Sequence, residues 1–588
     1  MSQVNSSLEV LTHSNRNIHH TLEIGDPEIG PDPKKVPLEN GISGGLTGML
    51  ENFHIGTNKA LQRNRKRLEL LCYVILHGLL IGYFSWATYY FLEYSDSTLD
   101  TTTCSGYGFL MILFIFINFG IIYYWLIKPF VIPIFNNLLW KPLSKEISKL
   151  LTIRFVKLLV YLIIFAAIVI YLIYDTSDNR RRLIPAIGLT LFLIFGFLFS
   201  QHPGQINWNL VIWGLLIQFA FGLLTIRWDV GRNIFECLGN KTTIFLGYAM
   251  DGSAFVYGDY LVHEIAVFAF QALSTIYFLG FMINILYHYG IMQKIVVTIG
   301  EFLQLVMGTT ICESSNSAAN IFLGMSEAPL LLKPYLSDLT ASEIHSVMTS
   351  GFATVSGTVL AAYISFGAEA SHLITASVMS APAALCYSKL LVPETEKIVA
   401  TKESISLTKS EYTSVLDAAS KGASLALEVV LGIISNLIAF IAFIFFLNGI
   451  LSWMGELVGY TGVNVWSVER FVGYIFMPVS YIMGVPWDEC EDVGRLIGIK
   501  TIINEFAAFK ELGKLNLKNK RTKVIATYAI CGFSNPGSIG IMISALSVLM
   551  PTKRHVVTKL VFRAFIAGEI VCFMTACIAA LLIPEKLL

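Results

Sequence analysis

The chain has 588 residues, of which 55% are hydrophobic and only 14% are charged. Soluble domains carry about 25% charged residues, and a soluble protein could not hide apolar runs as long as those found here. The net charge is zero, so the sequence shows no basic footprint for binding nucleic acid. This composition predicts an all-α polytopic membrane protein.

Residues 1–67 are polar, and we predict that they form a disordered cytoplasmic tail. They hold no short apolar region followed by a small-residue cleavage site, so we expect the first apolar run to remain as a membrane helix. Basic residues stand directly before that run, and the positive-inside rule then places the tail in the cytoplasm. They are Arg63, Arg65, Lys66 and Arg67.

About eleven apolar stretches are long enough to span a bilayer, which takes about 20 residues. They lie at about 68–92, 107–127, 155–174, 184–200, 209–225, 260–287, 344–367, 372–392, 425–450, 521–550 and 556–583. The first three belong to an N-terminal region, 68–183, that precedes a core at 184–583. A cytoplasmic start puts the lysine-bearing loops 128–154 and 393–424 inside and the short C-terminus, 584–588, outside. Arg180, Arg181 and Arg182 then fall outside, against the rule.

Other apolar or mixed segments do not fit as spans. Residues 289–307 and 467–486 are amphipathic and predict helices in the membrane interface, as does the mixed segment 226–257. Residues 308–337 and 487–515 combine small residues, prolines, Glu and Asn, and we predict two re-entrant hairpins there. The order of interfacial helix, hairpin, span and span then occurs twice, which is typical of an inverted repeat.

The first hairpin contains a carboxylate beside helix-breaking residues. Gly324 and Pro329 weaken a regular helix and free backbone carbonyls, and the Asn320 amide adds an oxygen ligand for a small hard cation. A charge at membrane depth costs about 2.5–3.5 kcal/mol even on the mildest scale. Glu327 therefore indicates a functional site, with a structural pair to Lys333 as the alternative.

Small and hydroxyl-bearing residues follow at 351–358, within an expected span. Thr354 can offer a hydroxyl oxygen and Val355 a carbonyl oxygen to the same cation. The alternative is that these small residues only allow helices to pack closely.

The second hairpin carries Glu505, for which an ordinary carboxylate at a helix end near Lys510 is the alternative interpretation. Three further acids at membrane depth stand alone, without a neighbouring break. For these we expect packing, hydrogen bonds within the bundle or a shallow position. They are Glu264, Glu428 and Glu569.

A second break is predicted at Pro536, which removes a backbone donor in mid-span. The freed polar groups need partners within the membrane. Asn535 and Ser538 beside the break, with Phe533 near them, form a plausible surface for a sugar. A kink that binds no ligand is the alternative.

Together these motifs resemble the concentrative nucleoside transporters. The resemblance covers about 184–583, and the three earlier spans with the long tail are similar to the eukaryotic branch. It rests on Asn320–Leu336, Ala362–Gly367, Ser377–Pro382, Asn504–Phe506 and Gly532–Asn535.

The resemblance implies a homotrimeric plasma-membrane symporter, not an enzyme, that imports nucleosides with sodium or, in some members, protons. It implies an elevator-like movement of a transport part against a scaffold, with sodium as coupling ion and no cofactor. The residues matching the nucleobase side are Gly324, Met325, Ser326 and Glu327. Those matching the ribose side are Glu505, Asn535 and Ser538, with Phe533 lining the pocket. Those matching the sodium ligands are Asn320 and Thr354 through side chains and Leu323 and Val355 through carbonyls.

Met325 departs from the family pattern, in which many members have Gln and many have Thr at the position of Ser326. The pairs Gly324-Met325 and Thr358-Val359 resemble the purine-preferring animal subtype. A glycine beside a methionine leaves room and a soft apolar wall for a two-ring base. We therefore predict a preference for adenosine, guanosine and inosine, with uridine accepted.

Two rival functions stay open. A transporter of nucleobases or another polar metabolite would use similar broken helices, and re-entrant segments also build the filters of channels. An enzyme is less consistent, because no nucleophile–base pair or metal-ligand spacing occurs on facing segments. A disulfide among Cys104, Cys237 and Cys490 and glycosylation of Asn240 are further open points.

Overall fold

The computed structural model describes residues 49–50, 53–54, 56–57, 63–94, 104–135, 154–399, 412–462 and 465–584. Most of the tail predicted at 1–67 and the last residues, 585–588, therefore lie outside the described residues. The described residues form helices and include no strand, which confirms the predicted all-α class.

The chain divides into two compact units, Met1–Glu146 and Ile147–Leu588. In the first unit, aromatic contacts join two apolar helices: the rings of Phe84 and Phe114 stack with their centroids 4.0 Å apart. The hydroxyl groups of Thr88 and Tyr107 add a hydrogen bond of 2.9 Å. The helices of this unit are α3 (Arg65–Tyr94), α4 (Gly106–Ile122) and α5 (Ile132–Phe135), with a π-helix (Tyr123–Val131) between the last two.

The second unit begins with helices that precede the repeats. These are α7 (Arg154–Asp175), α8 (Ile184–Leu198), α9 (Trp208–Gly222), α10 (Asp229–Tyr257), α11 (Phe268–Gln271) and α12 (Ser274–His288). Helix α10 corresponds to the mixed segment expected in the interface at 226–257.

The predicted order of elements occurs twice in this unit. The first set comprises α13 (Ile291–Met307), α14 (Ile311–Ala319), a 3₁₀ helix (Ala328–Asp338), α15 (Ala341–Ala353), α16 (Leu360–Ser365) and α17 (Ala370–Leu391). The second comprises α19 (Val468–Ile482), α20 (Cys490–Ile502), α21 (Glu505–Lys514), α22 (Lys520–Ile530), α23 (Pro536–Leu549) and α24 (Arg554–Leu582). Both sets contain an amphipathic helix, a helical hairpin, an interrupted helix and one long helix.

Among the described residues, nine continuous helices are long and apolar enough to cross a membrane. The two remaining stretches expected as spans, 344–367 and 521–550, are each interrupted. In the first, α15 ends at Ala353 and α16 begins at Leu360, with one short 3₁₀ turn between them. In the second, α22 ends at Ile530 and α23 begins at Pro536. The two interruptions therefore place two segments of non-helical backbone inside the helix bundle.

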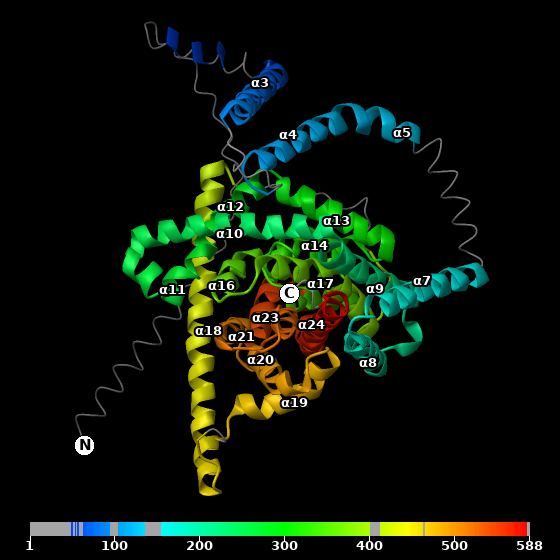
Figure 1. Cartoon of the computed structure of the whole chain (residues 1–588). Helices are drawn as coiled ribbons and strands as arrows, with labels where there is room; N and C mark the ends of the chain where they lie inside the picture. The colour runs from blue at the N-terminus through cyan, green and yellow to red at the C-terminus, as the bar shows by residue number, and fades with distance from the viewer. Residues whose placement is uncertain are drawn as a thin grey trace, which may run out of the picture. The chain divides into compact units, whose positions relative to one another are not determined.

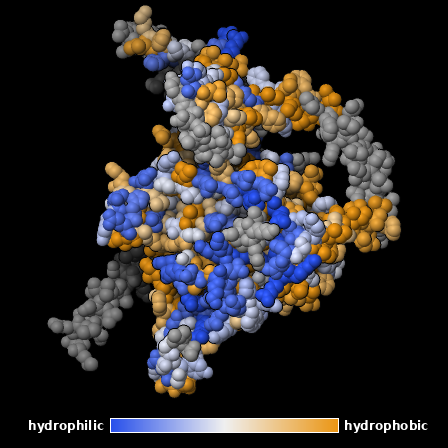
Figure 2. Space-filling model, in the orientation of Figure 1, coloured by the Kyte–Doolittle hydropathy of each residue, from blue (hydrophilic) through white to orange (hydrophobic). Residues whose placement is uncertain are grey.

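Helix α18 (Val415–Leu457) connects the two repeats. Figure 1 shows it as a long straight helix at the edge of the second unit, and it packs along α12. Helices α17 and α24 are instead almost wholly buried among other helices. Figure 2 shows hydrophilic residues gathered over the middle of the visible face of this unit and hydrophobic residues along its edge at α7 and α8. The apolar edge is the surface that a bilayer would contact.

Arg182 explains part of the arginine cluster that contradicts the positive-inside rule. Its guanidinium is buried and donates to Asp175 Oδ2 (2.6 Å), Asp178 Oδ1 (3.0 Å) and the Leu581 carbonyl (2.8 Å). The charge is neutralised within the fold and ties the start of α8 to the end of α24. Arg182 is therefore not a free loop charge of the kind that the rule counts.

Cys490 has a free, buried thiol. Cys490 therefore takes no part in a disulfide. Asn240 lies within helix α10 rather than in a loop.

Candidate functional site

The tip of the first hairpin lies where α14 ends. The helix begins with a reciprocal cap between Thr310 and Glu313, which satisfies backbone amides of its first turn. After Asn320 the chain turns, and the Glu327 and Ala328 amides both donate to the Gly324 carbonyl (3.1 and 2.9 Å). The break predicted around Gly324 is thus a tight turn that leads into the 3₁₀ helix.

Glu327 accepts a hydrogen bond from the Gly324 amide, at 3.1 Å to Oε2. This bond holds its carboxylate against the hairpin's own backbone. The alternative pair with Lys333 falls on a side chain outside the described set.

The residues predicted to bind sodium lie at two helix ends. Asn320 and Thr354 are 1% and 2% exposed, and they follow α14 and α15 directly. The Asn320 amide nitrogen donates to the Asn316 carbonyl (3.0 Å), while its buried Oδ1 has no hydrogen-bond partner among the described residues. This oxygen is therefore free to accept a hydrogen bond or to coordinate a cation.

The hairpin tip contacts the break that follows α15. The Gly357 amide donates to the Phe322 carbonyl at 3.1 Å. A Cβ placed on Gly324 would lie 3.5 Å from Ser356 Cβ. The structure therefore brings the first predicted ion-binding segment, 320–324, beside the second, 354–357.

Met325 is buried between two helices. A Cβ placed on Gly351 of α15 would lie 2.7 Å from Met325 Cβ and equally close to Met542 Cε of α23. Val359, the other residue of the expected purine signature, is also buried. Gly351 of α15 thus lies beside both the first hairpin and a helix of the second repeat.

Glu505 is the first residue of α21, which Asn504 caps by accepting from the Ala507 amide (3.0 Å). Its Oε2 accepts from Asn535 Nδ2 at 2.8 Å, and the Tyr363 hydroxyl donates to Oε1 at 3.4 Å. All three groups are buried. The alternative of an ordinary carboxylate beside Lys510 is therefore disfavoured.

Asn535 also caps α23, because its Oδ1 accepts from the Ser538 amide at 2.9 Å. Ser534 donates to the Phe352 carbonyl (3.1 Å) and joins this break to the end of α15. The break predicted in mid-span at Pro536 is present, because α22 ends at Ile530 and α23 begins at Pro536. Pro536 occupies the first turn of α23, where a missing amide proton is tolerated and a fixed φ favours the helix.

Two polar residues at this end were not singled out from the sequence. Tyr363 lies in α16, inside a motif that carried the family resemblance but no role. Lys500 lies in α20, and its buried ammonium forms an ion pair with Glu569 of α24. Glu569 thus has the bundle partner expected for it. No local pattern reveals either pairing, since the partners lie 142 and 69 residues apart.

A cavity of about 380 Å³ opens beside the tip of the first hairpin. Leu323, Ser326 and Glu327 line it on one side, and Asn284 of α12 and Glu428 of α18 on the other. Glu505 and Asn535 are not among its lining residues. The predicted base-side and ribose-side residues therefore form two groups here, linked through Met325, Met542 and α23.

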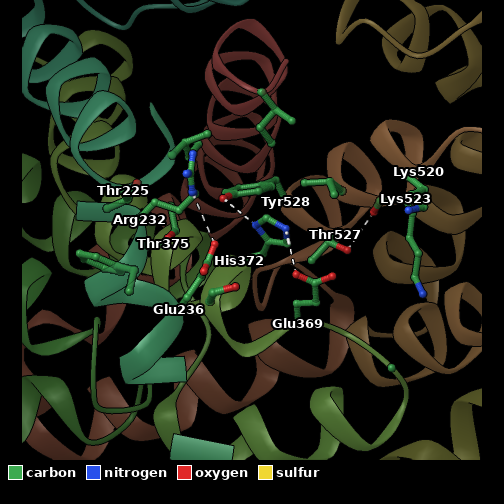
Figure 3. A pocket seen from close by; sticks show the side chains of 16 residues that line it. Thr225, Arg232, Glu236, Glu369, His372, Thr375, Lys520, Lys523, Thr527 and Tyr528 are labelled. Atoms are coloured by element: carbon green, nitrogen blue, oxygen red, sulfur yellow. Dashed lines mark hydrogen bonds and ion pairs between the residues drawn. The ribbon is translucent and has the colours of Figure 1, made fainter. Parts of the chain in front are cut away.

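A second cavity, of about 370 Å³, lies between α10, α17 and α22. Figure 3 shows His372 between Tyr528 and Glu369 there. Its ring nitrogens lie 3.4 Å from the Tyr528 hydroxyl and 3.3 Å from Glu369 Oε2. None of the predicted site residues lines this cavity.

Three family models match most of the second unit. They are described as "Na+ dependent nucleoside transporter N-terminus" (residues 187–260), "Nucleoside recognition" (269–370) and "Na+ dependent nucleoside transporter C-terminus" (372–580). Solute carrier family 28 member 3 of Eptatretus stoutii is 39% identical over 561 residues, which cover 92% of this chain and 79% of that protein. The chain belongs to the concentrative nucleoside transporter family.

Among other members, rat sodium/nucleoside cotransporter 2 is 43% identical over 71% of this chain and 65% of its own length. Rabbit sodium/nucleoside cotransporter 1 is 44% identical over 71% and 65%. The chain thus spans just under two thirds of these two relatives. Because the chain is about equally identical to cotransporter 1 and cotransporter 2, these identities do not assign it to either subtype.

Solved structures of the concentrative nucleoside transporter CNTnw share the fold. The inward-facing, substrate-bound structure is 34% identical, with a TM-score of 0.64, and the match covers 68% of this chain and 97% of that one. A double variant in an outward-facing state gives a TM-score of 0.65 over 68% and 98%. The family members are transporters, not enzymes, and the match supports a multi-pass membrane protein.

Proposed function

We propose that this protein is a symporter that imports nucleosides with sodium and prefers purine nucleosides. The observation that carries the proposal is the pair of buried polar groups at the two helix breaks. One group holds the unpaired oxygen of Asn320, and the other holds the Glu505 carboxylate with Asn535. The family and its named relatives supply the substrate class.

Sodium would bind where α14 and α15 end. The C-terminal end of a helix carries partial negative charge that favours cations, and interrupted helices in transporters coordinate ions with such ends. Asn320 Oδ1 faces this region without a partner, and the Thr354 hydroxyl donates to Ser350, which leaves its lone pairs free. The carbonyls of Leu323 and Val355 complete an all-oxygen set.

Ribose hydroxyls would bind at Glu505 and Asn535. A carboxylate accepts hydrogen bonds from a diol and an amide both donates and accepts, which matches the two hydroxyl groups of a sugar. Ser538 and Phe533 flank them, as the resemblance predicts, and Tyr363 adds a donor that already points at the carboxylate.

The base would bind beside Gly324, Met325, Ser326 and Glu327. Glu327 and Ser326 line the cavity at the hairpin tip, and Met325 offers a polarisable wall. Gly324 has no Cβ to narrow the space toward Ser356. This combination supports the preference for a two-ring base, with Val359 buried behind it.

The cavity between the hairpin tip and helices α12 and α18 supports an alternating-access movement. It lies between the tip of the first hairpin and the helix pair α12 and α18, where an elevator-like movement would need space. We propose the plasma membrane, a cytoplasmic N-terminus, an extracellular C-terminus and a homotrimer on the same resemblance.

Uptake measurements test this function. Radiolabelled adenosine, inosine and cytidine are followed in sodium and choline buffers at two pH values. We expect saturable adenosine and inosine accumulation that needs sodium. Accumulation in choline that rises with acidity would replace sodium by protons as the coupling ion. Flux without accumulation against a gradient would favour a channel.

A competition experiment tests the nearest rival, a nucleobase transporter. Ribose-bearing analogues should inhibit adenosine uptake, whereas adenine should not, because Glu505 and Asn535 have no partner on a free base. Equal inhibition by adenine would refute the ribose assignment.

A further inference from the structure

A fully buried lysine lies in the last turn of the first helix of the second hairpin. Lys500 lies in the last turn of α20, and its ammonium forms an ion pair with Glu569 of α24. Thr501 donates to the other oxygen of that carboxylate (3.3 Å), and the Ser534 hydroxyl also interacts with it. Lysine is almost never fully buried unless paired, and a charge within a membrane usually has a function.

Lys500 stands in the second repeat where sodium is proposed to stand in the first. Asn320 follows α14, the first helix of the first hairpin, and Lys500 lies in the last turn of α20, the first helix of the second. Thr354 lies in the break after α15, and Ser534 lies in the break after α22. Each position therefore joins the end of a hairpin helix to the interruption of the next span.

The two positions have similar helix-end electrostatics, but they differ in whether the protein itself provides charged side chains there. Both lie at C-terminal helix ends, which favour a cation. The second repeat adds a carboxylate, Glu569, from its last helix α24, whereas its counterpart α17 holds no Asp or Glu over 370–391. The first site therefore has oxygen atoms without a resident charge, and the second has a resident charge with its own counter-ion.

We propose that Lys500 is a tethered cation that holds the second repeat permanently in the arrangement that sodium imposes on the first repeat only while bound. This inference rests on the proposed sodium-coupled function. Lys500 also acts electrostatically on Glu505, five residues further along the hairpin. The ribose-side residues Glu505 and Asn535 thus stay assembled without sodium, and sodium controls only the first hairpin.

The test measures binding of labelled adenosine to the purified full-length protein across a sodium series. In Lys500→Met the Glu569 carboxylate and the hydroxyls of Thr501 and Ser534 remain, and such oxygen ligands suit a hard cation. We expect a second sodium to enter, so that the sodium dependence becomes steeper than in the wild type. Sodium should also raise the melting temperature of this variant more than that of the wild type.

Three variants serve as controls. Lys500→Arg keeps a tethered cation and should keep the wild-type sodium slope. Lys500→Met/Glu569→Gln removes both charges, so it should also keep that slope. Arg182→Met removes another buried, paired cation outside the hairpins and should lower stability without changing the slope.

Each outcome decides the inference. A folded Lys500→Met protein with the wild-type slope overturns it, as does a Lys500→Met protein that stays unfolded at every sodium concentration. A variant that is unstable in choline but is stabilised by sodium supports it. If the wild type binds adenosine equally well with and without sodium, the proposed function is contradicted instead. The failure of the inference and the failure of the proposed function are therefore distinguishable.

Discussion

The Asn535 side chain donates to Glu505 Oε2 over 2.8 Å while its own amide oxygen caps helix α23. One side chain therefore fixes both the carboxylate of the second hairpin and the start of the interrupted span. Removal of either partner leaves the other buried and unpaired, which is costly within a membrane.

We expect Glu505→Gln and Asn535→Ala each to reduce nucleoside affinity. A hydrogen bond to a charged group contributes about 1.5–3 kcal/mol, so the apparent affinity should fall by about tenfold or more. The measurement is adenosine uptake against adenosine concentration at saturating sodium, corrected for surface expression. Variants with wild-type affinity would remove both residues from the proposed ribose site.

Asn320→Ala should raise the sodium concentration needed for half-maximal uptake by about tenfold, since it deletes the unpaired oxygen from the proposed ion site. Thr354→Ala should act in the same direction, and Thr354→Ser, which keeps the hydroxyl, should not. Thr190→Ala is the matched control, because it deletes an exposed hydroxyl in α8 that bonds only its own helix. An unchanged sodium requirement in Asn320→Ala argues against the site.

The double variant Met325→Gln/Gly324→Ser should gain pyrimidine nucleoside uptake. A glutamine amide can hydrogen-bond a base edge, and a serine narrows the space beside it. Cytidine and thymidine uptake are measured beside inosine uptake in the same cells. Cytidine and thymidine uptake at the parent level would count against the proposed role of Met325 in base selection.

Gly351→Ala should destabilise the protein and lower uptake. The new Cβ would lie 2.7 Å from both Met325 and Met542, and overpacking of this kind costs about 1–3 kcal/mol. Gly540→Ala is the control, because a Cβ there meets nothing within 4 Å and alanine favours a helix. Melting temperatures of the purified proteins should move in opposite directions; a stable Gly351→Ala protein would mean that the contact can relax.

The sequence alone predicted those structural elements that depend on residues close together in the chain. Amphipathic periodicity located α13 and α19, and Gly324 with Pro329 marked the turn that Glu327 and Ala328 close. Pro536 marked the second break, where α22 ends at Ile530 and α23 begins at the proline. Tyr363 and Lys500 were missed because their partners come from distant segments, and a single chain gives no signal for such a pairing.

A main-chain hydrogen bond joins the first hairpin to the break after α15: the Gly357 amide donates to the Phe322 carbonyl. Side chains at 324–326 contribute nothing to this bond, so they can be exchanged without loosening it. Under the proposed assignment, sodium is held by the side chains of Asn320 and Thr354 and by two carbonyls, whereas the residues at 324–326 select the substrate. Substitutions at 324–326 would then change which bases are accepted without removing any proposed sodium ligand.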